Sequence, residues 1–259
     1  MGLCDNRTII ITGAGGGLGR AYAIALGVAG GNVVVNDINP DTAAETVKII
    51  NDAGGQAIVN LDDITDYASA GKILTTTIEH FGDVHAVVNN AGNNRDRMFT
   101  SLTEDDWDDV IRVHLKGHFC LSSHAAKYWR EKSKNGENPD ARIINTSSGA
   151  GLQGSVGQTN YAAAKGGILT LTLNQSAELA RYGITTNSVA PLIVYLCSPA
   201  SADINGYCFE AFGGKLSIAD GYKTGPIKDK EARYEPEEIE AVIRELIDIT
   251  PPAQKVYGS

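Results

Sequence analysis

Cysteine is scarce in this 259-residue sequence, and its four copies lie far apart, at Cys4, Cys120, Cys197 and Cys208. No C-x-x-C pair occurs, and no histidine stands at a metal-ligand spacing from any of them. These thiols therefore predict neither a disulfide framework nor a metal site. Reduced cysteines in a cytoplasmic protein are the simplest interpretation.

Positive charge and long apolar runs are also scarce. The sequence has 22 Lys and Arg against 31 Asp and Glu, a formal net charge of −9. Because phosphate contacts need clustered Lys and Arg, neither nucleic acid nor a membrane is expected as a partner. No run approaches the ~20 apolar residues that span a bilayer. A strand pattern that begins at Thr8 leaves no room for a signal peptide, so the cytoplasm is the expected location.

Short apolar runs do alternate regularly with longer helical patterns. The runs are rich in β-branched residues and almost continuously apolar, which is typical of parallel strands covered on both faces. They are Thr8–Ile11, Asn32–Val35, Ala57–Leu61, Val84–Val88, Arg142–Asn145 and Ile184–Val189. The helical patterns are Leu18–Ala29, Asp41–Ala53, Tyr67–Phe81, Glu104–Trp129 and Thr159–Tyr182. This alternation predicts one α/β domain with a Rossmann-like, doubly wound parallel sheet.

The last part of the chain differs in composition. We place the main domain at residues 1–214 and a C-terminal extension at residues 215–259. Gly221, Gly225 and Pro226 punctuate the extension, and a further helix is expected with Pro236 in its first turn. The apolar residues on one face of that helix are Ile239, Val242, Ile243, Leu246 and Ile247. The pattern predicts a helix packed on the body or on a neighbouring subunit.

A glycine-rich segment joins the first expected strand to the first expected helix. Glycines permit a tight turn and a close approach of backbone to a pyrophosphate, and a helix N-terminus supplies N–H groups and a positive dipole end. The context of strand, glycines and helix favours a dinucleotide site over a simple turn. The candidate cofactor-binding residues here are Gly13, Gly16, Gly17, Leu18 and Gly19.

Asp37 ends the second expected strand, 18 residues after Gly19. A carboxylate at this place accepts hydrogen bonds from the ribose hydroxyls and repels a 2′-phosphate. No arginine follows at residues 38–40 to receive such a phosphate. We therefore expect NAD rather than NADP as the cofactor. The alternative is that Asp37 only caps the helix that follows.

Four motifs in order resemble those of the short-chain dehydrogenase/reductase family. They are the G-x-x-x-G-x-G loop, Asn89-Asn90-Ala91-Gly92, Ser148, and Tyr161-Ala-Ala-Ala-Lys165. The resemblance covers about residues 6–214. Within the family the chain looks most like the 3-hydroxyacyl-CoA dehydrogenase part of peroxisomal multifunctional enzyme type 2. That similarity rests on Val35-Asn36-Asp37, on residues 113–117 and on the long tail.

The resemblance implies roles for individual residues. Ser148, Tyr161 and Lys165 would be catalytic. The residues that would contact the cofactor, besides the glycine loop and Asp37, are Asp63 and Ile64 beside the adenine, Asn90, Ala91 and Gly92 along the cleft, and the Tyr161–Lys165 pair. The family also implies a homodimer or homotetramer built on the fourth and fifth helices.

The chemistry requires such a set of side chains. A carbonyl oxygen needs a proton supplied or removed when a hydride moves to or from its carbon. Tyrosine, with a pKa of about 10, is a poor base at neutral pH unless its phenolate is stabilised. Tyr161 and Lys165 are four residues apart, so they share a helix face and the ammonium would stabilise that phenolate. The Ser148 hydroxyl would hold the substrate oxygen.

Taken singly, each of these residues has an ordinary structural explanation. A Tyr and a Lys four apart are usually surface neighbours, and a Ser after a strand usually caps a turn. Their joint occurrence after a nucleotide-binding half favours catalysis.

His114 departs from the family pattern, which places an asparagine here. That asparagine holds the helix open around a water that links the lysine to solvent. The imidazole of His114 either serves the same relay or is a buried structural residue. The other histidines have no motif around them and are expected at surface or helix positions; they are His80, His85, His118 and His124.

A second departure lies at Pro191, which runs directly into Leu192. Family members have a Pro-Gly turn and a substrate-binding loop at this point. Either the protein itself lacks this loop, or the natural protein has residues between Pro191 and Leu192 that this sequence omits. The segment that would best identify the substrate is therefore absent.

The predicted function is that of an NAD-dependent oxidoreductase of lipid metabolism that interconverts a secondary alcohol and a ketone. A 3-hydroxyacyl-CoA is the favoured small-molecule substrate, and a steroid or polycyclic alcohol is the next. A 3-oxoacyl reductase would normally use NADPH, and Asp37 argues against it. A non-catalytic NAD-binding regulatory module is opposed by the intact Ser148, Tyr161 and Lys165.

Overall fold

The computed structural model describes residues 2–188, 192–212, 215–219, 225–231, 236–251, 256 and 258. The expected turn at Gly221 lies outside these residues. The junction at Pro191 also lies outside them, so the structure does not decide between a loop that the protein lacks and a loop that the sequence omits.

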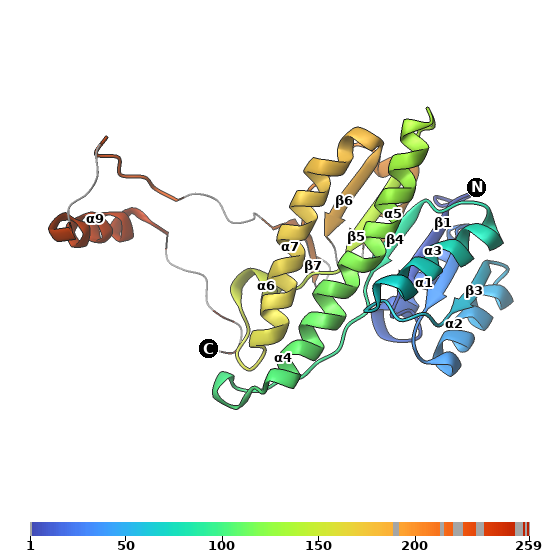
Figure 1. Ribbon diagram of the computed structural model, residues 1–259, viewed down its shortest axis with the longest axis horizontal. Helices are drawn as coiled ribbons and strands as arrows, with labels where there is room; N and C mark the ends of the chain where they lie inside the picture. The colour runs from blue at the N-terminus through green and yellow to red at the C-terminus, as the bar shows by residue number, and fades with distance from the viewer. Residues whose placement is uncertain are drawn as a thin grey trace.

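Six parallel strands form the central sheet in the order β3-β2-β1-β4-β5-β6 (Figure 1). They are β1 (Thr8–Thr12), β2 (Asn32–Asn36), β3 (Gln56–Asn60), β4 (Ala86–Asn89), β5 (Ala141–Asn145) and β6 (Ile184–Ser188). The strand order reverses between β1 and β4, and such a switch point opens a crevice at the carboxyl ends of the strands. The predicted fold class is confirmed.

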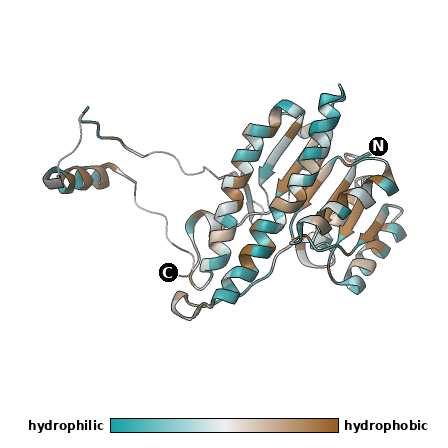
Figure 2. Ribbon diagram, viewed as in Figure 1, coloured by the Kyte–Doolittle hydropathy of each residue, from teal (hydrophilic) through white to brown (hydrophobic). Residues whose placement is uncertain are grey.

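Helices cover both faces of this sheet. One face carries α1 (Gly17–Val28), α2 (Pro40–Asp52) and α8 (Ile193–Cys197), and the other carries α3 (Tyr67–Phe81), α5 (Gly117–Lys134) and α7 (Thr159–Leu179). Because strand side chains alternate, Ile9 and Ile11 of β1 pack on the first face and Ile10 on the second. The middle residues of β1 and β2 are accordingly apolar, whereas β6 is mostly polar (Figure 2).

Helix starts follow the capping residues of the sequence. The Asn39 side chain accepts hydrogen bonds from Asp41 N and Thr42 N at the start of α2. Thr103 and Asp106 form a reciprocal capping box at the start of α4 (Glu104–Ile111). Each such cap contributes about 1 kcal/mol.

The single helix predicted over Glu104–Trp129 is interrupted. After α4 the chain passes through a π-helical turn, η2 (Arg112–Lys116), before α5 continues to Lys134. A π turn holds one more residue than an α turn and therefore rotates the side chains that follow. Here it sets His114 against Gly92: a Cβ on Gly92 would lie 2.2 Å from His114 Cε1. Apolar periodicity does not reveal this change.

Short elements complete the described chain: η1 (Phe99–Ser101), α6 (Gly149–Gln153), η3 (Ala180–Tyr182), η4 (Pro199–Ser201), β7 (Phe209–Phe212), β8 (Lys215–Ile218) and α9 (Pro236–Ile249). Strands β7 and β8 pair as an antiparallel hairpin. A single parallel bridge between Ser188 and Cys208 links this region to β6.

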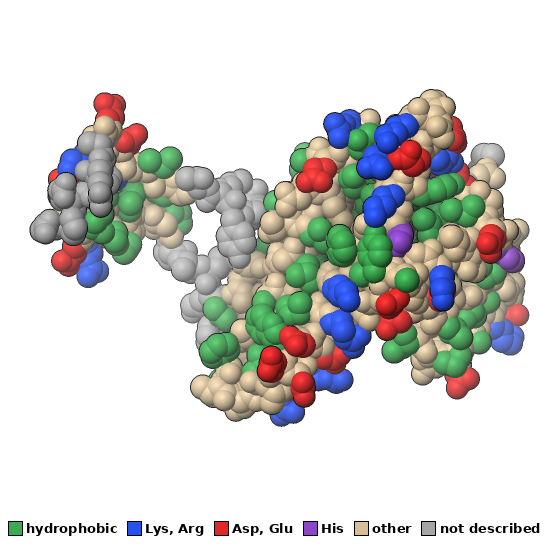
Figure 3. All heavy atoms as spheres, viewed as in Figure 1, with side chains coloured by type: hydrophobic (Ala, Val, Ile, Leu, Met, Phe, Trp, Pro, Cys, Tyr) green, Lys and Arg blue, Asp and Glu red, His purple; other side chains and the backbone are tan. Residues whose placement is uncertain are grey.

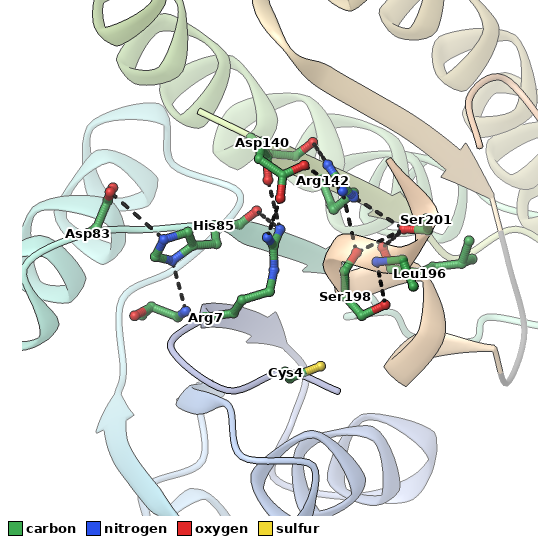
Figure 4. Close-up of polar contacts among 12 residues, drawn as sticks. Cys4, Arg7, Asp83, His85, Asp140, Arg142, Leu196, Ser198 and Ser201 are labelled. Carbon is green, nitrogen blue, oxygen red and sulfur yellow. Dashed lines mark hydrogen bonds and ion pairs between the residues drawn. The ribbon is translucent and has the colours of Figure 1, made fainter. Parts of the chain in front are cut away.

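Buried charges tie the amino ends of the strands together (Figure 4). Arg7 and Arg142 are 4% and 1% exposed, and both donate to the Asp140 carboxylate at 2.8 and 2.7 Å. Arg142 also donates to Ser201 in η4. Burial, and then the neighbouring Arg142, lower the pKa of Arg7. Since an unpaired buried charge is costly, the single carboxylate stabilises both guanidinium groups.

Candidate active site

Two connected hollows lie at the carboxyl ends of the strands, with volumes of ≈ 520 and ≈ 370 Å³. The residues that line both hollows are Gly13, Asp37, Ala91, Gly92 and Asn93. The larger hollow extends over Asp63 and Ile64, and the smaller one over Tyr161 and Lys165. Together they form one cleft at the predicted switch point.

The glycine loop at this cleft needs its glycines for two different reasons. Gly13 has φ +63°, and a Cβ on Gly19 would lie 2.1 Å from the Gly13 carbonyl oxygen, so the turn itself requires them. A Cβ on Gly16 would instead have no neighbouring atom within 4 Å. One on Gly17 would also lie in open space, but Gly17 has φ +53°, which favours glycine. No side chain caps the N-terminus of α1. Its first N–H groups therefore have no side-chain acceptor, which leaves them available to an anion such as a pyrophosphate.

Asp37 holds the glycine loop and does not cap α2. Its Oδ2 accepts from Gly15 N at 2.9 Å, and its Oδ1 accepts from Asn39 N at 3.0 Å. The cap of α2 is Asn39.

A further residue at the glycine loop, Arg20, was not predicted from the sequence. Its guanidinium donates to the Gly15 carbonyl and forms an ion pair of 2.7 Å with Glu45.

The far end of the cleft contains the two residues expected beside an adenine. Asp63 Oδ1 accepts from Thr65 N at 2.8 Å, which fixes the turn after β3. Ile64 is buried and packs on Gly117: a Cβ there would lie 2.7 Å from Ile64 Cδ1. An apolar side chain beside a carboxylate suits a flat ring with polar edges.

Thr12 joins the glycine loop to the segment that follows β4. Its hydroxyl accepts from Asn90 N at 3.0 Å and Ala91 N at 3.1 Å. The Asn90 amide donates to the Thr12 carbonyl at 3.1 Å. Thr12 was missed as a site residue, although a hydroxyl at the carboxyl end of a buried apolar strand is the signal that could have identified it.

Tyr161 and Lys165 lie together on α7, as their spacing predicts. The Lys165 ammonium is 5.5 Å from the Tyr161 ring centroid and donates to the Thr146 carbonyl at 2.6 Å. Lys165 is 2% exposed, and burial lowers its pKa to about 7. The side chain can therefore change its protonation state near neutral pH.

His114 packs against the Tyr161 ring, with ring centroids 5.2 Å apart and ring planes at 89°. Its Nε2 lies 3.0 Å from Asn93 N and 2.8 Å from Asn93 O. Burial, and then the charge of Lys165, lower the His114 pKa to about 4, so the ring is neutral at pH 7. Its buried Nδ1 contacts no hydrogen-bond partner among the described residues.

Ser148 caps the short helix α6, and its Oγ accepts from Ala150 N at 3.2 Å. It is half-buried and is not among the residues that line the two hollows. Because Oγ is the acceptor in this bond, the hydroxyl proton stays available for donation.

A buried polar network beneath the cleft was not predicted. The Asn89 amide donates to Ser122 at 2.8 Å and to Asn145 at 3.0 Å, and the Asn145 amide donates to Thr172 at 3.0 Å. Asn89 and Asn145 close two apolar strands, and an amide in that position is the signal that could have found the network. His118, on α5, is 1% exposed, and burial holds its pKa well below the ordinary value.

Two other kinds of site are missing from the part of the chain that the structure describes. None of its helices combines the length and the apolarity needed to cross a bilayer. Within the same residues, His, Cys, Asp and Glu side chains do not gather in threes in a way that could hold a metal ion.

Comparison with known proteins agrees with this architecture. Residues 7–204 match the family model described as short chain dehydrogenase. Hydroxyacyl-CoA dehydrogenase ChsB1 of Mycobacterium tuberculosis is 35% identical over 290 aligned residues, 96% of this chain and 91% of that protein. The mouse peroxisomal multifunctional enzyme type 2 is 40% identical over 72% of this chain, which corresponds to 25% of that enzyme.

Solved structures show the same likeness. The crystal structure of a short chain dehydrogenase from Mycobacterium avium superposes with a TM-score of 0.97 at 45% identity, covering 100% of both chains. Levodione reductase superposes with a TM-score of 0.76 at 25% identity over 82% of this chain. The resemblance inferred from the four motifs is confirmed.

Proposed function

Because the chain belongs to the short-chain dehydrogenase/reductase family and is an oxidoreductase, we propose that it oxidises 3-hydroxyacyl-CoA thioesters with NAD. The observation that carries the proposal is the placement of Tyr161 and Lys165 at one end of a cleft whose other part is lined by Asp37. The substrate class is supported by the relative that covers 96% of this chain and is named a hydroxyacyl-CoA dehydrogenase.

The cleft fits a dinucleotide. The open space over Gly16 and Gly17 would take the pyrophosphate, Asp37 the ribose hydroxyls, and Ile64 one face of the adenine. The segment from Asn90 to Gly92 would line the path to the reacting ring. When bound, NAD supplies the hydride acceptor. Side chains of the protein itself must accept the proton of the substrate hydroxyl.

Tyr161 would take the proton from the substrate hydroxyl as the hydride leaves the neighbouring carbon. The Lys165 ammonium lies near the ring and stabilises the phenolate that accepts this proton. The Ser148 hydroxyl, which has its own proton free, would donate a hydrogen bond to the substrate oxygen and hold it beside Tyr161.

His114 would link Lys165 to solvent. Its neutral ring packs edge-on against Tyr161, and its buried Nδ1 has no hydrogen-bond partner among the described residues, so this nitrogen is the one that would exchange a proton with a water. A neutral imidazole can accept and donate through its two nitrogens, which is what a proton relay requires.

NAD is preferred over NADP because the Asp37 carboxylate would meet the 2′-phosphate. Arg20, whose guanidinium contacts the glycine loop, is already paired with Glu45. This pairing leaves the negative charge of Asp37 to decide the selectivity.

A substrate screen tests the proposal. Purified protein is incubated with NAD and with 3-hydroxyacyl-CoAs of several lengths, hydroxysteroids and polycyclic alcohols, and reduced cofactor is followed by its absorbance. We expect turnover of the thioesters, with kcat/KM at least 100-fold higher for NAD than for NADP. A faster reaction with NADP would reject the cofactor assignment, and turnover of steroids alone would reject the substrate class.

A further inference from the structure

Asn160 directly precedes the proposed proton acceptor Tyr161 and is fully buried, with 0% of its surface exposed. Its Nδ2 donates to the Arg95 carbonyl at 3.2 Å and to the Asp106 carbonyl at 3.0 Å, and its Oδ1 accepts from Tyr161 N at 2.8 Å. An amide side chain has two N–H donors and one acceptor oxygen, so these three bonds use both of its polar atoms. The residue therefore joins the first turn of α7 to α4 and to the segment that follows β4.

A short parallel pairing, here called the clip, surrounds this residue. It consists of residues 95–97 beside residues 157–160. Arg97 N donates to the Gly157 carbonyl at 2.8 Å, and a parallel bridge joins Arg97 to Gln158. The clip lies where the segment after β4 reaches the start of α7, and it fixes one against the other.

The clip also contacts α4, which lies beside α7 (Figure 1). Arg97 forms an ion pair of 2.6 Å with Asp106. Figure 3 shows acidic and basic side chains gathered at the surface over α4. Ion pairs that water can reach hold a geometry only weakly. The amide of Asn160 is shielded from water, so its hydrogen bonds hold these segments more firmly than the surface ion pair does.

The segment after β4 supports Tyr161 a second time, through the ring. Asn93, two residues before Arg95, has its backbone N 3.0 Å from His114 Nε2. The His114 ring in turn packs on the Tyr161 ring, with centroids 5.2 Å apart. The backbone and the ring of Tyr161 are thus both tied to residues 93–95, and a shift of this segment would disturb both supports.

We propose that Asn160 is a positioning residue for the proton transfer by Tyr161; this rests on the proposed function. Asn160 is not among the residues that line the two hollows, so it acts through its neighbour and touches neither substrate nor cofactor. Its amide sets the distance between the first turn of α7 and the segment after β4. That distance determines where the phenolic oxygen of Tyr161 stands in the cleft. A displacement of about 1 Å at a reacting group lowers a rate by about 100-fold.

Kinetics of three full-length variants test this role. Asn160→Asp keeps the shape of the side chain and removes both N–H donors, whereas Asn160→Ser leaves a hydroxyl too short to reach both carbonyls. Asn174→Asp makes the first change at an exposed position of the same helix and is the control. The kcat for 3-hydroxyacyl-CoA oxidation is expressed per NAD-binding site, counted by calorimetric stoichiometry, so that unfolded molecules do not contribute.

We expect kcat per site to fall by about 100-fold in Asn160→Asp and by about tenfold in Asn160→Ser, because Tyr161 is displaced. KM and the Kd for NAD should stay within about threefold of wild type, since neither depends on a group that acts only in the transition state. The control should keep the wild-type kcat. Wild-type kcat per site in both Asn160 variants, or a loss confined to KM or to NAD affinity, would overturn the proposal.

Crystal structures of the wild type and of Asn160→Ser test the same role without any substrate. We expect the phenolic oxygen of Tyr161 to move by about 1 Å relative to a superposed six-stranded sheet. An unmoved Tyr161 would overturn the proposal whatever the enzyme turns over. A wild-type protein that oxidises no thioester would instead reject the proposed substrate class, and the position of Tyr161 in the two structures would then decide the role of Asn160.

Discussion

Lys165 is subject to two opposing demands. Its ammonium is buried, which costs free energy, while the proposed reaction needs that charge beside Tyr161. The Thr146 carbonyl accepts a hydrogen bond from one of its three N–H groups and offsets only part of the cost. A destabilising charge retained in a buried position is typical of a functional site.

Replacing Lys165 should therefore separate stability from activity. In Lys165→Met we expect turnover to fall at least 100-fold, whereas the cofactor-free protein becomes more stable at pH 6, by on the order of 1–2 kcal/mol. The folded pKa of Lys165 is about 7, below its usual 10.5. The unfolded wild-type chain thus binds more protons between these pH values, and wild-type stability rises as pH increases through that window.

The advantage of the Met variant should therefore be full below pH 7 and should shrink towards pH 10. Urea unfolding of both proteins at pH 6 and pH 9 measures it. A stability difference that does not change with pH would show that the burial of this charge is not what costs the wild type its stability.

Tyr161 carries the proposed proton transfer, and its phenolic oxygen can be removed without changing the ring. In Tyr161→Phe the ring can still pack against His114. We expect kcat to fall at least 10³-fold, while the calorimetric Kd for NAD changes less than threefold. Tyr182→Phe, in η3, is the control and should keep wild-type activity. Wild-type rates in Tyr161→Phe would refute the mechanism.

At the scale of elements, the glycine loop combines two kinds of requirement that mutation can separate. Gly19→Ala would place a Cβ 2.1 Å from the Gly13 carbonyl, so we expect a loss of about 1–3 kcal/mol in the cofactor-free protein. Gly16→Ala places its Cβ in open space, at φ −156°, which any residue adopts. Its cofactor-free stability should match wild type.

NAD affinity should nevertheless fall at least tenfold in Gly16→Ala, because the methyl group occupies the space assigned to the pyrophosphate. Thermal unfolding without cofactor and calorimetry with NAD distinguish the two variants. Unchanged NAD affinity in Gly16→Ala would place the pyrophosphate elsewhere.

Elements with a strong local signal were predictable from the sequence. The helix Tyr67–Phe81 has the predicted bounds, because Asp66 caps its start and Gly82 adopts the left-handed conformation that ends it. The π turn around His114 was not predictable from apolar periodicity, because the feature that accompanies it, the packing of the imidazole on Gly92, is a contact between distant segments. The β7–β8 hairpin was missed, although Gly213-Gly214 between two short runs is an ordinary hairpin signal.

The same distinction applies to the candidate site. The motif residues Asp37, Tyr161 and Lys165 were predicted because their spacing along the chain carries the signal. The partners that hold the site, Thr12 and Thr146, were missed because their roles depend on contacts across strands. Thr146 acts through its carbonyl group, which every residue type possesses, so no sequence pattern could identify it.

At the scale of the whole molecule, the two ends of the sheet have different tasks. The carboxyl ends carry the cleft, whereas the amino ends carry the ion-paired cluster of the buried Arg7 and Arg142 with the half-buried Asp140 (Figure 4). There the Asp140 carboxylate accepts hydrogen bonds from both guanidinium groups, which links the segments before β1 and β5. Arg142 also donates to Ser201, which connects the cluster to η4. Stability and chemistry should therefore be separable by mutation.

Asp140→Asn tests this separation. Asp140 has φ +45°, a conformation that asparagine also tolerates, so the backbone need not change. The substitution leaves two buried guanidinium groups without a carboxylate, and we expect a loss of about 2–4 kcal/mol in the free energy of unfolding. Asp52→Asn, which removes the exposed Lys48–Asp52 pair on α2, should cost less than about 0.5 kcal/mol.

Because the cluster lies at the opposite end of the sheet from Tyr161, kcat of the folded Asp140→Asn protein should match wild type. A change in kcat without a loss of stability would show that the two ends of the sheet are coupled.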